Sequence, residues 1–163
     1  MVEGLAIADP ERDLAKIAVV ERHLGTGRHA VGLVRGFGLR SGALASTFSH
    51  DAHNIVVVGM DDQDMARAIA RLTEIGGGVV VVEDRGVRAE LPLPIAGLIS
   101  QAPLDTVVAA SRGCIDAAAK LGCTLPSPFQ TMAFLALSVI PSLKITDHGL
   151  VDVDRFELVP LEV

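Results

Sequence analysis

Short β-branched segments fill the first half of this chain, and a regular helical pattern begins only after four of them. Clusters of Val, Ile and Ala bounded by Gly and polar residues are typical of strands. They lie at residues 16–21, 31–35, 39–49 and 55–59, and a further pair, 79–83 and 87–90, forms a hairpin. Strands that precede most of the helices, without strict strand–helix alternation, predict an α+β fold: a single domain with a largely antiparallel β-sheet covered by helices.

Three helices are expected, at residues 61–75, 104–121 and 129–137. The first has the clearest pattern, because its apolar residues recur at spacings of three and four and acidic residues crowd its first turn. We expect Asp105 to open the second helix and Gly122 to close it.

Two segments are expected to lie at the margins of this fold. Pro92 and Pro94 predict that residues 91–98 lie outside the sheet, since proline cannot donate to a strand ladder. Residues 150–153 and 156–159 are expected to form a short tail that pairs with the sheet.

The composition limits the partners of the chain. It has 163 residues, a net charge of −6, five Phe and no Trp or Tyr. Clustered cations for a phosphate backbone and aromatic platforms for stacked bases are therefore missing, and we expect no nucleic-acid partner. The length suffices for one self-sufficient core, so we expect one domain over residues 1–163.

Nothing in the sequence predicts a membrane or secreted protein. Residues 1–20 lack the basic start and apolar run of a signal peptide, and the longest nearly apolar stretch, 132–140, is shorter than the roughly 20 residues that span a bilayer. Cys114 and Cys123 cannot build a disulfide framework and are expected to pack as small hydrophobes. We therefore expect a cytoplasmic protein.

The densest polar cluster lies between two apolar segments and consists of Ser49, His50, Asp51, His53 and Asn54. Imidazole and carboxylate are metal ligands and proton carriers, but an extended strand would place His50 and His53 on opposite faces. Convergence requires a turn. A polar turn that hydrogen-bonds its own backbone remains the simpler interpretation from spacing alone. His23, His29 and His148 lie in turns and are expected to face solvent.

Several blocks resemble the C-terminal domain of bacterial adenine deaminase, in the order of that family. The resemblance runs from about residue 14 to residue 160, with Ala52 where the family usually has Ser. The blocks are residues 31–40 (VGLVRGFGLR), 42–46 (GALAS), 49–54 (SHDAHN) followed by 55–59 (IVVVG), 90–97 (ELPLPIAG), 121–128 (LGCTLPSP) and 143–153 (LKITDHGLVDV).

The resemblance implies a hydrolase of the amidohydrolase superfamily that converts adenine and water to hypoxanthine and ammonia. A divalent metal (Mn, Fe or Zn) held by a (β/α)8 barrel would activate the water. No His-x-His motif occurs here, and the chain is too short for a barrel of about 250 residues beside this domain. We therefore expect the barrel in another part of the same protein or in a neighbouring chain.

The resemblance also implies roles for the polar cluster. Ser49, His50, Asp51, His53 and Asn54 would face the barrel and complete the adenine pocket, or His50, Asp51 and His53 would hold an auxiliary metal. The chain is then an excised or separately encoded domain that is inactive alone, or a stand-alone protein without the metal site.

The alternative function is a non-catalytic binding or oligomerisation module. The surplus of aliphatic residues predicts an apolar face around 129–140 and 91–98 that docks on the barrel, and self-association to a homo-oligomer where that face is uncovered.

Overall fold

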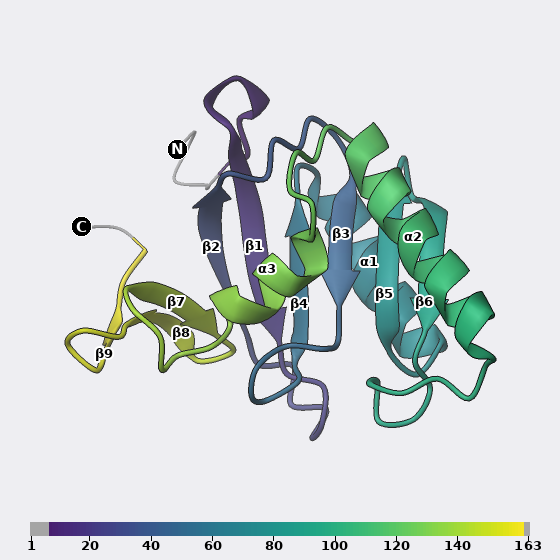
Figure 1. Ribbon diagram of the computed structural model, residues 1–163. Helices are drawn as coiled ribbons and strands as arrows, with labels where there is room; N and C mark the ends of the chain where they lie inside the picture. The colour runs from purple at the N-terminus through teal and green to yellow at the C-terminus, as the bar shows by residue number, and fades with distance from the viewer. Residues whose placement is uncertain (1–6, 162–163) are drawn as a thin grey trace.

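The core of the fold is a six-stranded antiparallel sheet (Figure 1). A computed structural model describes residues 7–161 of the chain. The strand order is β2-β1-β4-β3-β5-β6, and every neighbouring pair is antiparallel. This confirms the predicted α+β class. The strands are β1 (Leu14–Val20), β2 (His29–Arg35), β3 (Ala43–Ser46), β4 (Ile55–Gly59), β5 (Gly78–Glu83) and β6 (Gly86–Pro92).

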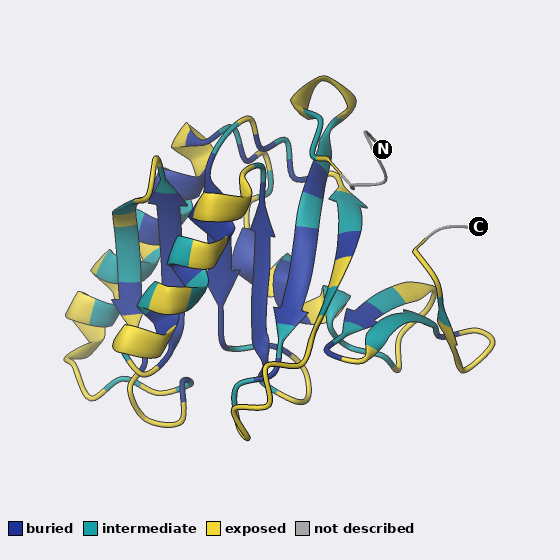
Figure 2. Cartoon of the chain, turned by 180° about the vertical axis from the view of Figure 1, so that it is seen from behind, coloured by how far each residue is buried: buried dark blue, intermediate teal, exposed yellow. Residues whose placement is uncertain are grey.

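Helices cover both faces of this sheet. Helix α1 (Asp62–Glu74) lies on one face, while α2 (Leu104–Lys120) and α3 (Pro128–Leu135) lie on the other (Figure 1). Alternate residues of β4 accordingly enter two different cores: Val57 packs with α1, whereas Val56 and Val58 pack with the α2 and α3 side. Two covered faces explain why β4, in the middle of the sheet, has no polar side chain and is buried at every position (Figure 2).

The C-terminal segment forms a second sheet of its own. Strands β7 (Leu143–Thr146), β8 (Gly149–Asp152) and β9 (Glu157–Val159) pair in that order, and β7 and β8 pack against β2. A Cβ at Gly32 of β2 would lie 3.3 Å from Leu150 Cδ2, so the missing side chain allows this close approach. The prediction that this tail joins the main sheet was therefore wrong, because an unpredicted strand, β7, provides its partner.

Other differences from the sequence predictions concern element ends. The strand expected at 39–49 contains only β3, because Gly42 turns the chain with φ +69. Residues 91 and 92 belong to β6, so the prediction that the whole of 91–98 lies outside the sheet was wrong at its start. Pro92 is tolerated because β6 is an edge strand.

The helix ends also differ slightly. Helix α3 begins at Pro128 and ends at Leu135, two residues before the predicted end. Helix α2 has Pro103 at its N-cap without a side-chain capping bond, so Asp105 lies in its first turn without being the cap. Gly122 follows α2 with φ +97, as its predicted role in closing the helix requires.

The antiparallel order gathers one set of loops at one end of the sheet. We call this the loop end and define it by residues 21–28, 47–54, 93–103, 136–142 and 147–148 (Figure 1). None of the helices described in residues 7–161 has the length and apolarity needed to cross a bilayer.

Candidate functional site

A pocket of about 450 Å³ opens at the loop end. Four segments line it: the β1–β2 loop, the β3–β4 loop, the connection after α3 and the β7–β8 turn. Residues of these segments lie far apart in the chain, as for Arg28 and Asp147 at 119 positions, and the sheet order brings them together. The polar lining residues are Glu21, His23, Arg28, Ser49, His50, Asp51, Asn54, Ser138, Thr146, Asp147 and His148.

Four of the five predicted site residues line this pocket: Ser49, His50, Asp51 and Asn54. The Ser49 hydroxyl is buried and donates to the Asn54 carbonyl at 2.9 Å. His50 and Asp51 are exposed. The imidazole of His50 lies against the ring of Phe134 on α3, with 5.1 Å between the ring centroids. The two outward-facing groups are therefore carried on a turn whose ends are buried.

His53, the fifth predicted residue, is not part of the pocket lining. Its backbone is left-handed (φ 51) and its N–H donates to the Ser49 carbonyl at 3.0 Å, which closes the turn. Its ring Nδ1 is buried and has no hydrogen-bond partner among the described residues.

The pocket rests on a buried carboxylate that the sequence interpretation had not selected. Asp147, in the β7–β8 turn, accepts from Asn54 Nδ2 at 3.0 Å and from Arg28 Nε at 2.5 Å. His148 beside it is exposed, as predicted. Asp147 lies within the family block 143–153, and that block was the only sequence feature that could have marked it.

Glu21 stabilises the β1–β2 loop from within. Its buried carboxylate accepts the backbone N–H groups of Leu24 (2.7 Å), Thr26 (3.1 Å) and His23. These bonds, led by those from Leu24 and Thr26, lower the pKa of Glu21 to about 2. The carboxylate therefore holds the loop that carries His23 and Arg28 to the pocket.

The described residues do not fit a metal centre. Within 7–161, no group of three or more His, Cys, Asp or Glu side chains is placed to hold a metal ion. The assignment of His50, Asp51 and His53 as metal ligands therefore remains a prediction, and such a site would need ligands from outside the described residues. The pocket itself offers hydrogen-bonding groups and one ring face, which suit binding and orientation of a polar ligand.

The two cysteines take no part in the pocket lining. Both are buried, as predicted, and burial raises the pKa of Cys114 to about 12. A thiol that stays protonated at neutral pH and lies in a core serves packing instead of nucleophilic attack.

The chain folds as a single α+β domain, and polar side chains gather around the pocket at its loop end. The family described as adenine deaminase C-terminal domain matches residues 1–157. The chain belongs to this family.

Curated relatives carry the name adenine deaminase. This chain is similar to those of Oleidesulfovibrio alaskensis (59% identical over 98% of this chain), Brucella abortus (60% over 93%) and Cereibacter sphaeroides (56% over 98%). It spans only 28%, 26% and 28% of their respective lengths. The larger part of these relatives therefore has no counterpart in the 163 residues.

Proposed function

We propose that this domain closes the active site of an adenine deaminase, with its loop end facing a catalytic barrel supplied by the rest of the protein or by a neighbouring chain. The observation that carries this proposal is the contrast between exposed His50 and Asp51 and the hydrogen-bonded network beside them, in which Asn54 and Asp147 are buried and Arg28 is partly exposed. These hydrogen bonds hold the turn in place, while the exposed side chains of His50 and Asp51 remain accessible to a ligand or to another domain.

The chemistry of adenine fits the exposed groups. The base is planar, donates through its amine and ring N–H, and accepts through its ring nitrogens. Asp51 accepts, His50 donates or accepts according to its tautomer, and the tilted pair of His50 and Phe134 offers a ring edge or face for stacking. In this proposal these residues bind and orient the base, while Ser49 and Asn54 hold the turn.

The reaction itself belongs to the rest of the deaminase. A divalent metal there (Mn, Fe or Zn) would supply activated water, and the described residues of this domain provide no cluster of ligands for it. The domain alone is therefore expected to release no ammonia from adenine.

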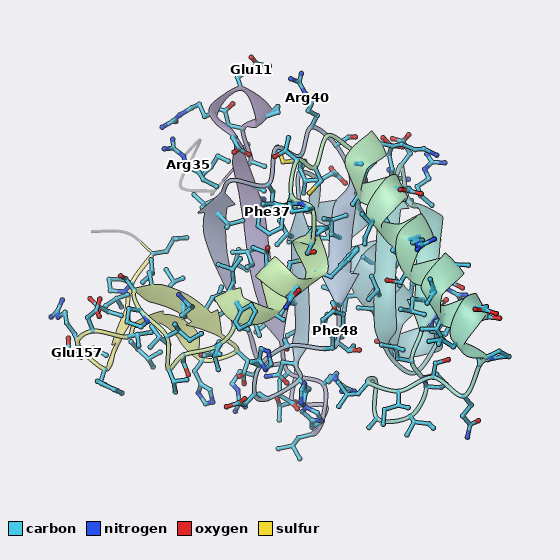
Figure 3. All side chains as sticks on the ribbon, viewed as in Figure 1. Glu11, Arg35, Phe37, Arg40, Phe48 and Glu157 are labelled. Carbon is cyan, nitrogen blue, oxygen red and sulfur yellow. The ribbon has the colours of Figure 1, made fainter. Side chains whose placement is uncertain are left out.

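The proposal is tested in a chimera: the deaminase of Oleidesulfovibrio alaskensis with its matching region replaced by this chain. We expect His50→Ala, and more so the double variant His50→Ala/His53→Ala, to lower kcat/KM about tenfold or more at an unchanged melting temperature. Arg40→Ala is the control, because Arg40 is exposed at the opposite end of the sheet (Figure 3).

Two outcomes would contradict the proposal. The first is wild-type kinetics in the double variant. The second is robust ammonia release by the 163-residue chain alone in the presence of Mn²⁺, Fe²⁺ or Zn²⁺, because this domain would then contain the catalytic centre itself.

An assembly role is the second candidate. It is favoured by exposed apolar side chains at the end of α3 and just after it, where Phe134 is 41% exposed and Val139 is 67% exposed. A surface of this kind suits a partner domain or a second copy of the chain.

A further inference from the structure

Arg22 connects three loops at the loop end. Its Nε donates to the carbonyl of His53 at 2.5 Å, and its Nη2 donates to the carbonyl of Ala96 at 2.6 Å. The acceptors lie 31 and 74 residues away in sequence. One guanidinium thus links the β1–β2 loop to the site turn at 49–54 and to the segment 93–99.

The packing around this guanidinium leaves little freedom. Gly97 has φ +73, and a Cβ at that position would lie 2.8 Å from Arg22 Nη2. On the other side, the buried Thr47 hydroxyl donates to the Gly97 carbonyl at 2.6 Å and accepts from the Gly78 N–H at 2.8 Å. The segment 93–99 is therefore anchored both to Arg22 and to the ends of strands β3 and β5.

A neighbouring contact has the same form. Nε2 of His23 lies 2.6 Å from the carbonyl oxygen of Ala52. The adjacent side chains of Arg22 and His23 therefore contact the carbonyls of two adjacent residues of the site turn. Glu21 fixes the loop that carries both, through its bonds to backbone N–H groups. Because the acceptors of Arg22 are backbone carbonyls, the position of the main chain itself depends on this residue.

We propose that Arg22 is the positioning residue of the site: it holds the turn 49–54 and the segment 93–99 in one arrangement and so fixes the direction in which His50 and Asp51 point. Its effect on deamination rests on the proposed function above. The ordering of the two loops does not.

The ordering is tested by NMR relaxation on the 163-residue chain. In Arg22→Ala we expect backbone order parameters at residues 50–53 and 96–98 to fall from about 0.85 to below about 0.6. Arg22→Lys keeps the charge but loses the planar fork, and is expected to loosen at least one of the two loops. Arg35→Ala is the matched control, because Arg35 is exposed at the other end of the same β1–β2 hairpin (Figure 3).

Gly97→Ala is the sharper variant. Its methyl group would lie 2.8 Å from Arg22 Nη2, so the guanidinium must shift away from its acceptors, in addition to the backbone strain at φ +73. Loosening should therefore extend to residues 50–53, which belong to a different loop. Unchanged order parameters in both loops of Arg22→Ala, or loosening confined to 93–99 in Gly97→Ala, would overturn the positioning role.

The activity measurement separates the two proposals. In the chimera, Arg22→Ala should raise KM severalfold while kcat stays within about twofold, since a less ordered site mainly weakens binding. Loosened loops with unchanged KM would support the role of Arg22 in ordering and contradict the proposed function. Rigid loops with altered KM would contradict the positioning role.

Discussion

The side-chain amide of Asn54 donates to the carboxylate of Asp147 at 3.0 Å across 93 residues of sequence. Both side chains are buried, and this bond joins the start of β4 to the turn between β7 and β8. The small C-terminal sheet is thereby tied to the loop end of the main sheet. The carboxylate accepts only, so its partner atom must be the amide nitrogen, which fixes the orientation of the Asn54 side chain.

Asp147→Ala should destabilise the folded chain by about 1–3 kcal/mol, because it leaves the Asn54 amide buried without an acceptor. Equilibrium urea unfolding measures this change. Asp154→Ala, at an exposed position near the same sheet, is the control and should stay within about 0.5 kcal/mol of wild type. Equal stabilities for the two variants would show that the buried bond contributes nothing.

The stability of the chain should fall at acid pH through Glu21. Hydrogen bonds from backbone N–H groups lower its pKa from 4.5 to about 2. A carboxylate with a lower pKa in the folded state stabilises that state fully above pH 4.5, and its contribution is lost as the pH falls toward 2.

Urea midpoints measured between pH 2 and 6 test this dependence. Glu21→Gln should remove part of the decline, whereas Glu11→Gln, which is exposed at the other end of the sheet (Figure 3), should keep it. Parallel pH profiles for wild type and Glu21→Gln would contradict the assignment.

Two glycines should respond in opposite directions to alanine. Gly42→Ala places a Cβ 2.4 Å from the Val82 carbonyl at φ +69, so a marked loss of stability is expected. Gly113 lies within α2 with open space around it, so Gly113→Ala should stabilise by roughly 0.5–1 kcal/mol. Thermal unfolding of both variants provides the measurement, and a melting temperature for Gly42→Ala at or above wild type would contradict the expected clash.

The isolated chain is expected to self-associate through the apolar side chains at the end of α3 and just after it. Val139, Phe134 and Ile140 are 67%, 41% and 37% exposed. Sedimentation equilibrium over a range of concentrations should show association that Val139→Lys weakens. Glu157→Lys, another exposed position, controls for the added positive charge. A strictly monomeric wild-type chain would contradict this docking face.

The predicted apolar face proved to be divided between core and surface. Phe129, Met132 and Ala133 are buried in the domain's own core, as are Leu91 and Leu93. The exposed apolar residues lie farther along, at Phe134, Val139 and Ile95. Apolar character in the sequence could not separate these groups, because burial depends on which side of each segment packs against the sheet and its helices.

The sequence by itself determined the class of fold, the positions of its main strands along the chain, the clearest helix and the family. Local chemistry suffices for these features: β-branched runs favour strands, a three-to-four spacing favours a helix, and acids in its first turn favour its N-terminus. The cluster at 49–54 also stood out in the sequence, since polar residues between apolar strands are conspicuous in any conformation.

Only the tertiary structure decided which residues surround that cluster. Asp147 and Arg22 contact the site turn from other loops, and Arg28 pairs with Asp147. The strand order β2-β1-β4-β3-β5-β6 brings those loops to one end. The separate sheet of β7, β8 and β9 was likewise decided by packing against Gly32. Contacts between residues so distant in the chain depend on sheet order and close packing, and the pattern of a single sequence records neither.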